Sequence, residues 1–288
     1  MFVALRYTRT GALSSTRHCP KARRTRDERM AKQSVTSDDD RSCAADQAQP
    51  GAFSYEGRDL EAMAFATNYH RSILNVFRPY LGRHVVEIGS GTGAFTRLIV
   101  QEPIDRLTAI EPSPEMFPLL ERAIAPAGRV QVQALNGCLA DGVAELRLQA
   151  VSSCVLVNVL EHIEGDLDEL LRVKEVLDVG GHVCVFVPAL MALYSRFDAV
   201  IGHCRRYTKG ELESKARQAG FEICYSRYFD LLGVVPWWLR FRLLKADGLS
   251  VHAVQTYDRF GVPLMKLLDR AHGPPIGKNV IMVARRVT

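Results

Sequence analysis

Short apolar runs alternate along this chain with segments whose apolar residues recur at helical spacing. The first run, at Val85, Val86 and Ile88, predicts a buried strand, and the apolar residues from Phe95 to Ile99 then lie on one face of a helix. The alternation continues to residue 229, and a last apolar run follows near the C-terminus. Strands that alternate with helices indicate an α/β domain with a parallel sheet covered on both faces.

The pattern assigns most of the chain beyond residue 50 to particular elements. We expect strands at residues 84–88, 106–112, 130–135, 153–163, 182–188, 221–229 and 279–286, and helices at 58–79, 114–125, 165–177 and 208–218. Pro79 and Gly180-Gly181 are expected to end two of these helices, and Thr208 with Glu211 forms a capping box at the start of another. About 50 residues separate the last two strands, far more than a hairpin needs, so we predict a substrate-lid insertion at about 229–276.

A glycine-rich turn joins the first strand to its helix, in the order Gly89, Ser90, Gly91, Thr92, Gly93. Such a turn brings bare backbone and the positive end of a helix close to a ligand. Glu87 precedes the turn, where a carboxylate would repel a pyrophosphate but suits an ammonium or a sulfonium. Glu111 lies about 20 residues on, where a dinucleotide site places its ribose-binding acid, so the turn alone leaves both kinds of ligand open.

Two longer patterns resemble one family. The stretch E-x-G-x-G-x-G from Glu87 to Gly93 resembles motif I of class I S-adenosylmethionine (SAM) methyltransferases, and NVLEHI at 158–163, followed by a double glycine and a strand, resembles their fourth and fifth motifs. The resemblance covers about residues 55–228. It implies a doubly wound, Rossmann-like sheet of seven mostly parallel strands, with the last strand antiparallel, and SAM as the cofactor.

The same resemblance implies roles for individual residues. The acid and the glycines of motif I would hold the methionine end of SAM, Glu111 would bind the ribose hydroxyls, and Pro112 and Met116 would flank the adenine. Cys138 stands where the family usually has an acid, so only the Leu139 N–H is left there to reach the base. The predicted cofactor-binding residues are Glu87, Gly89, Ser90, Gly91, Thr92, Gly93, Glu111, Pro112, Met116, Cys138, Leu139 and Asn158.

Two segments are expected beside the acceptor, together with the helix that precedes motif I. Arginines and tyrosines in residues 188–208 suggest an anionic acceptor, although local carboxylates such as Glu211 and Glu213 are alternative partners for the arginines. Residues 229–244 combine tryptophans with arginines, which fits a membrane-interface surface, an apolar lid or an ordinary core helix. The predicted substrate-binding residues are Tyr69, His70, Tyr194, Arg205, Arg206, Tyr207 and Trp237.

We therefore expect a SAM-dependent O- or N-methyltransferase that acts on a small or lipid-like acidic acceptor. A catalytic base is needed only if the acceptor arrives protonated, and His203 and His162 are the candidates. A non-catalytic SAM-binding protein and a dinucleotide-dependent oxidoreductase are the alternatives. The fourth motif is not the N/D-P-P-Y/F loop used on exocyclic base amines, which disfavours methylation of nucleic-acid bases.

Composition adds expectations about the N-terminus and the compartment. The net charge of +5 is concentrated in residues 1–50, which hold ten basic and six acidic residues, so the near-neutral remainder offers no nucleic-acid surface. We expect this extension to be disordered; the acid-free residues 1–26 fit a mitochondrial transit peptide, but the preferred explanation is an upstream start codon, with translation beginning at Met30. No secretory signal or spanning run is visible. Seven scattered cysteines without C-x-x-C indicate a reduced, cytoplasmic protein; we expect no metal site, and only Cys204 beside His203 suggests one.

Overall fold

The computed structural model describes residues 63–125, 128–246, 248–270 and 273–288. The predicted disordered extension 1–50 and the first residues of the helix expected at 58–79 lie outside the described residues. Among the described residues, no helix is both long enough and apolar enough to cross a bilayer.

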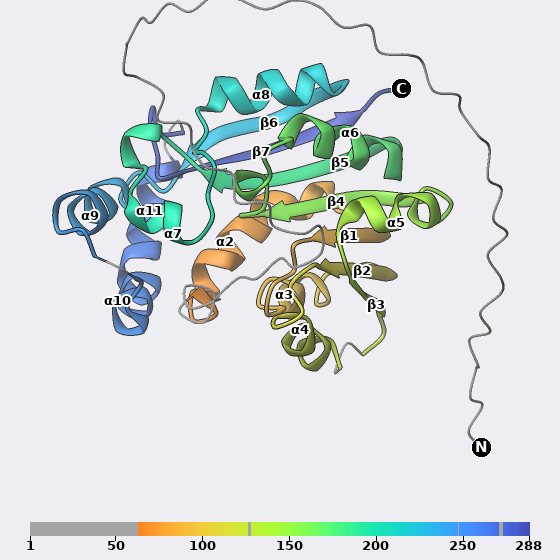
Figure 1. Ribbon diagram of the computed structural model, residues 1–288, viewed down its shortest axis with the longest axis horizontal. Coiled ribbons are helices and arrows are strands. Elements are labelled where there is room, and N and C mark those ends of the chain that lie inside the picture. The colour runs from red at the N-terminus through yellow and green to blue at the C-terminus, as the bar shows by residue number, and fades with distance from the viewer. Residues whose placement is uncertain (1–62, 126–127, 247, 271–272) are drawn as a thin grey trace, which may run out of the picture. The chain divides into compact units, whose positions relative to one another are not determined.

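The sheet has seven strands in the order β3-β2-β1-β4-β5-β7-β6, as Figure 1 shows. Every neighbouring pair is parallel except those of β7, which runs antiparallel to β5 and β6, so the predicted fold is confirmed. The order reverses between β1 and β4, and ligands of such sheets bind beyond the carboxyl ends of the strands at that point. The strands are β1 His84–Ile88, β2 Arg106–Glu111, β3 Gln131–Asn136, β4 Val151–Val157, β5 Leu177–Pro188, β6 Phe221–Phe229 and β7 Asn279–Arg286.

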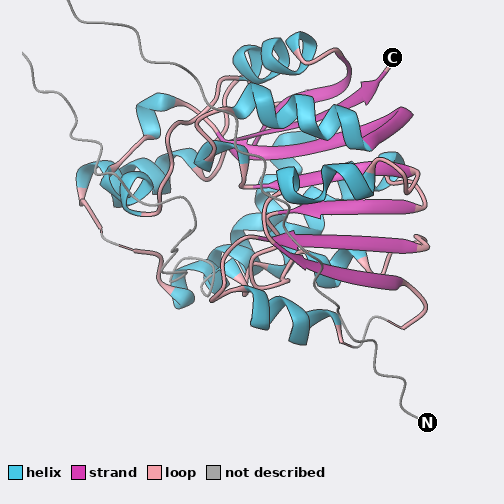
Figure 2. Ribbon diagram, turned by 45° about the vertical axis from the view of Figure 1, so that its right-hand side comes forward, coloured by secondary structure: helices cyan, strands magenta, loops and turns pink. Residues whose placement is uncertain are grey.

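Helices cover both faces of the sheet (Figure 2), because successive residues of a buried strand point to opposite sides. Val86 of β1 belongs to a buried cluster with residues of α5, α6 and α8, whereas Val85 belongs to a second cluster with residues of α2, α3 and α11. The helices before β6 are α2 Thr67–Phe77, α3 Thr96–Ile99, α4 Phe117–Ile124, α5 Leu139–Leu146, α6 Asp166–Val176, α7 Arg196–Val200 and α8 Lys209–Gln218, with short turns η1 Arg78–Tyr80, η2 Leu160–His162 and η3 Met191–Leu193.

The expected role of the Gly180-Gly181 pair was wrong. Helix α6 ends at Val176, and Leu177, which is buried, already pairs with Val151 in the sheet. The glycines lie inside β5, where the pairing skips from Leu177 to His182. Gly180 has a φ of +85°, and a Cβ on Gly181 would come within 2.9 Å of the Asp178 carbonyl oxygen. Burial of Leu177 therefore ends the helix, and the glycines form an irregularity in the strand.

The insertion between β6 and β7 is helical and lies near the carboxyl ends of the parallel strands, as Figure 1 shows at the left. Val262 and Met265 of α11 are buried against residues of α2, which anchors the insertion to the sheet. Its elements are α9 Val234–Trp237, η4 Trp238–Leu243, α10 Val251–Thr256, η5 Tyr257–Gly261 and α11 Val262–Arg270.

Candidate active site

A cavity of about 520 Å³ lies at the carboxyl ends of β1, β2, β4 and β5. The glycine turn and the ends of these strands form one part of its wall. The other part comes from α2, from the segment after β5, from the insertion and from the start of β7. The cavity therefore joins the expected cofactor region to the expected acceptor region.

The glycine turn needs its glycines for both backbone and packing reasons. Gly89, Gly91 and Gly93 have φ values of +70°, +54° and +78°, which residues with a Cβ rarely adopt. A Cβ on Gly89 would lie 2.6 Å from the Val159 side chain, and one on Gly93 would lie 2.5 Å from the Cβ of Ala123. Gly89 and Gly91 line the cavity, whereas Gly93 does not and instead allows the turn to pack closely against α4.

Two carboxylates face the cavity from the ends of neighbouring strands. Glu87 is buried and accepts a hydrogen bond from the Thr96 hydroxyl at 2.5 Å, and burial raises its pKa to about 7. Glu111 accepts backbone N–H bonds from Gly91 at 2.6 Å and from Ser113 at 2.8 Å. Burial raises the pKa of Glu111, although these two N–H groups oppose the rise. A cation or a pair of hydroxyl groups placed between the two carboxylates would find acceptors on both sides.

The remaining predicted cofactor residues also line the cavity. Asn158 holds a φ of +55°, and its N–H donates to the Phe186 carbonyl, which fixes the turn after β4. Cys138 precedes α5 and donates its N–H to the Asp141 carboxylate at 2.8 Å, so the acid missing at position 138 is present three residues later but is engaged with the backbone. The cavity-lining residues among this set are Ser90, Thr92, Pro112, Met116, Cys138, Leu139 and Asn158.

Arg206 is the predicted acceptor residue that the structure places most firmly in the cavity wall. Its guanidinium donates to Asp198 from Nε at 2.8 Å and from Nη2 at 2.7 Å, and from Nη1 to the Ala189 carbonyl at 3.2 Å. The guanidinium carbon lies 4.8 Å from the centre of the Trp237 ring, which also lines the cavity. Burial opposes ionisation of Asp198, but His203 and Arg206 outweigh it and lower its pKa to about 2.

Three other predicted acceptor residues do not line the cavity, which corrects the sequence analysis. Arg205 pairs with Asp166 at 2.7 Å, and the Tyr207 hydroxyl donates to the same carboxylate at 2.8 Å. The Tyr194 hydroxyl donates to the His203 carbonyl at 2.7 Å. Residue 207 bridges to Ala189 as a strand would, so consecutive side chains point to opposite sides, and only Arg206 of the run 205–207 reaches the cavity. The local partner of Arg205 is neither Glu211 nor Glu213.

Helix α2, which precedes motif I, contributes Tyr69 and His70, both buried and both in the cavity wall. Burial lowers the pKa of His70 to about 4, so its ring is neutral near pH 7. The Tyr69 hydroxyl lies 3.0 Å from a carboxylate oxygen of Asp230 and 3.0 Å from the amide oxygen of Asn279. Asp230 is fully buried, so this network connects α2, the insertion and β7 beneath the cavity.

Sequence reasoning missed Lys278 and Asn279. The ammonium of Lys278 lies 3.2 Å from Asp230, 4.9 Å from the Tyr69 ring centre and 5.5 Å from the Trp237 ring centre. Since β7 runs antiparallel, its first residues reach the edge where the parallel strands end, and that direction is the signal that identifies them. Two more missed residues, Glu169 and Arg172 of α6, form an ion pair at 2.9 Å in the wall. Further missed residues are apolar and include Phe95, Phe186, Pro188, Phe197, Ile201 and Leu249.

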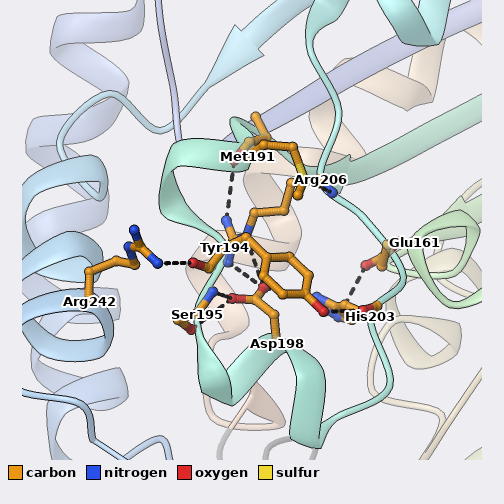
Figure 3. Close-up of polar contacts among 9 residues, drawn as sticks. Glu161, Met191, Tyr194, Ser195, Asp198, His203, Arg206 and Arg242 are labelled. Carbon is orange, nitrogen blue, oxygen red and sulfur yellow. Dashed lines mark hydrogen bonds and ion pairs between the residues drawn. The ribbon is translucent and has the colours of Figure 1, made fainter. Parts of the chain in front are cut away.

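The two candidate bases come together, although they are far apart in the sequence. The centres of the His162 and His203 rings lie 4.6 Å apart, and both residues line the cavity. Nδ1 of His203 lies 3.0 Å from the Asp198 carboxylate, as Figure 3 shows. Burial lowers the pKa of His162 to about 4, so this ring is neutral and able to accept a proton only weakly.

Comparison with known proteins agrees with this geometry. The family model described as a methyltransferase domain matches residues 66–226. No curated protein matches the chain. Among solved structures, the chain resembles the methyltransferase of the Haloferax volcanii Trm112 activator complex (16% identity, 81% of this chain and 95% of that one, TM-score 0.53). It also resembles a SAM-dependent methyltransferase from Archaeoglobus fulgidus (16% identity, 79% and 98%, TM-score 0.51).

A third likeness is to phosphoethanolamine N-methyltransferase 2 from Haemonchus contortus, with 13% identity and a TM-score of 0.52 over 81% of this chain and 58% of that one. At these identities the solved structures support the fold alone. The family model covers more than half of the chain and includes the glycine turn, Glu111 and both motifs after β3, which sets aside the oxidoreductase and non-catalytic alternatives. This chain therefore belongs to the methyltransferase domain family and is a SAM-dependent methyltransferase.

Proposed function

We propose that the enzyme methylates a small or lipid-like acidic acceptor held between Arg206 and Lys278. The observation that carries this proposal is that Arg206 and Lys278, two cationic side chains from different segments, both lie in the cavity wall; Arg172, which also lines it, pairs with Glu169 on its own helix. Each forms an ion pair with a buried aspartate, Arg206 with Asp198 and Lys278 with Asp230. Fixed cations of this kind suit a carboxylate or a phosphate.

Unused hydrogen-bond donors support the same acceptor class. Asp198 and the Ala189 carbonyl take up three of the five guanidinium N–H groups of Arg206, which leaves about two for a ligand. The indole Nε1 of Trp237 is buried and has no hydrogen-bond partner among the described residues. Because Trp237 lines the cavity beside Arg206, an anionic acceptor would supply the oxygen that this donor lacks.

In the proposed arrangement, Glu87 and the glycine turn hold the methionine end of SAM, and Glu111 holds the ribose hydroxyls. When bound there, SAM would supply a methyl group by displacement, in which the acceptor's new bond to carbon would form as the carbon–sulfur bond breaks. The apolar wall excludes water, and alignment of the two reactants supplies much of the rate enhancement. A carboxylate acceptor, which the two cations favour, needs no base.

The surface of the insertion favours an acceptor with an apolar part. Many apolar side chains of residues 234–268 are exposed. In η4, Arg240 and Arg242 alternate with apolar residues. We infer that residues 229–244 contact the surface of a membrane, with apolar side chains in the interface and arginines near anionic head groups. The large exposed apolar residues among the described part of the insertion are Val235, Trp238, Leu239, Leu243, Leu244, Val251, Phe260, Leu264, Leu267, Leu268 and Ile276.

A methyl-transfer assay with labelled SAM tests the proposed acceptor class. The panel pairs each carboxylate or phosphomonoester with a neutral amide or ester of the same size, both in solution and in vesicles. We expect transfer to the anionic member of each pair, with a further gain where the molecule carries an acyl chain. Equal or better transfer to the neutral members would contradict the role given to Arg206 and Lys278.

A further inference from the structure

We propose that Glu161, His162 and His203 bind a divalent transition-metal ion at the acceptor end of the cavity. Each residue offers one ligand atom, and these atoms all lie within 4.8 Å of one another. Glu161 and His162 belong to η2, whereas His203 follows α7. The sequence predicted no metal site, because the three ligands come from segments that only the fold brings together.

The first support for the site is a buried carboxylate with no hydrogen bond. Glu161 is 0% exposed, and neither of its carboxylate oxygens has a hydrogen-bond partner among the described residues. Nε2 of His203 lies 3.7 Å from one of these oxygens. Burial of a carboxylate is unfavourable unless a charge or hydrogen bonds compensate for it, and a metal ion at this point supplies both charge and coordination.

The second support is the way in which His203 is held. Its Nδ1 lies 3.0 Å from Asp198, and its Nε2 faces Glu161. A histidine that binds a metal through one nitrogen usually donates its other N–H to a carboxylate, which fixes the tautomer and the ring orientation. Asp198 is itself held by the Ser195 N–H and hydroxyl, both at 2.8 Å, and by Arg206, as Figure 3 shows. This arrangement makes Nε2 the nitrogen that is available to a metal.

The donor set indicates the kind of ion. Two imidazole nitrogens and one carboxylate suit zinc and its first-row neighbours better than calcium or magnesium, which prefer oxygen ligands. Ligand atoms around a tetrahedral ion at about 2.1 Å lie about 3.4 Å apart, so the pair at 3.7 Å is already close to that spacing. The third ligand atom, from His162, lies within 4.8 Å of the other two.

The open side of the ion would face the cavity, because both histidines line it. Three protein ligands with an open position are typical of catalytic sites, and structural sites have four. On the basis of the proposed function, the ion would bind an oxygen of the acidic acceptor and add positive charge beside Arg206. The competing explanation is a metal-free ion pair in which a protonated His203 lies between Asp198 and Glu161.

Metal titration of the full-length protein, stripped with a chelator, separates these explanations. We expect the parent to bind one equivalent of Zn²⁺ or Mn²⁺ by calorimetry, and Glu161→Gln and His203→Asn to weaken this binding at least about tenfold. His252→Asn is the matched control, because His252 is exposed on α10 and distant in sequence from the cluster. Its binding should equal that of the parent. Parent protein without a one-equivalent site, or variants that bind as the parent does, would overturn the proposal.

A second measurement avoids dependence on the variants folding. Co²⁺ added to the stripped parent should give the visible absorption of a coordinated ion with nitrogen ligands, and Zn²⁺ should displace it. The free-ion spectrum at one equivalent would overturn the site. Methyl transfer to acidic acceptors by protein with no metal site would leave the proposed function standing, and metal binding without preference for acidic acceptors would leave the site standing.

Discussion

At the residue scale, Glu111 connects the glycine turn after β1 to the segment after β2. Its carboxylate accepts the Gly91 and Ser113 N–H groups, and in the proposed complex it also binds the ribose. We predict that Glu111→Ala weakens SAM binding roughly 10- to 150-fold, because loss of a hydrogen bond to a charged group costs about 1.5–3 kcal/mol. Calorimetry measures this, with Glu115→Ala as the control, since Glu115 is exposed and does not line the cavity. Unchanged affinity of Glu111→Ala for SAM would show that the ribose does not bind at Glu111.

Arg205 and Arg206 are neighbours with opposite surroundings, which makes them a matched pair. Arg206→Gln should raise the acceptor KM while the SAM dissociation constant stays nearly unchanged, because only Arg206 lines the cavity. Arg205→Gln should leave both constants near those of the parent and lower only the melting temperature, since Arg205 pairs with Asp166.

Loss of Arg206 also removes the cationic arginine partner of the buried Asp198, which keeps its contacts to Ser195 and His203, so Arg206→Lys is measured beside it. Lysine keeps the charge but not the fork that binds Asp198 and a ligand together. An increase in KM that is partly restored by lysine supports contact with the acceptor. A KM that changes equally in Arg205→Gln and Arg206→Gln would remove Arg206 from the acceptor site.

At the element scale, the insertion between β6 and β7 both closes the cavity and exposes an apolar surface. Trp237 points into the cavity wall, whereas the next residue, Trp238, is 46% exposed. We predict that Trp238→Ser combined with Leu239→Ser reduces co-sedimentation with anionic vesicles severalfold, with little change in melting temperature, because both side chains are exposed. Addition of salt should weaken the binding of the parent.

The control for this surface is Leu148→Ser. Leu148 is 81% exposed but lies between α5 and β4, where β4 begins and not where the cavity opens. Equal vesicle binding by the double variant and the parent would contradict membrane contact through residues 229–244. A loss of vesicle binding in Leu148→Ser as well would show that general surface apolarity is responsible.

At the scale of the whole molecule, the buried carboxyl of Glu87 links stability and cofactor binding to pH. Burial raises its pKa from 4.5 to about 7, so the folded protein holds this proton more tightly than the unfolded chain does. Its contribution to the free energy of unfolding is fully present below about pH 4.5 and is lost as the pH rises to about 7. SAM, a cation, requires the ionised form, so its affinity should increase up to roughly tenfold per pH unit below about 7 and then level off.

Calorimetry at several pH values, in buffers of different ionisation enthalpy, measures both the affinity and the proton released on SAM binding. Glu87→Gln should abolish the release, and its weaker affinity should no longer follow pH across this range. Glu111 is the other carboxyl that acts on Glu87, and Glu111→Gln should shift the profile only modestly. Proton release that persists in Glu87→Gln would assign the titration to another group.

The sequence alone was sufficient for the parts of the molecule that depend on neighbouring residues. Strand β1 His84–Ile88, which includes Glu87, runs directly into the glycine turn, so their mutual positions follow from local backbone geometry and from burial of the apolar run. The capping box at Thr208 was predictable for the same reason, since its two hydrogen bonds join residues three apart. The resemblance of the motifs to those of class I methyltransferases then predicted the seven-stranded sheet with its last strand antiparallel.

Only the tertiary structure decided which distant side chains share the cavity. Arg206 faces it and Arg205 does not, because the bridge between Ala189 and Tyr207 sets the alternation of side chains. Lys278 reaches it because β7 runs antiparallel. The approach of His203 to Glu161 likewise depends on how the segment after β5 folds back over η2. Local patterns record burial and backbone hydrogen bonding, whereas side-chain direction and contacts between remote segments are determined only when the sheet assembles.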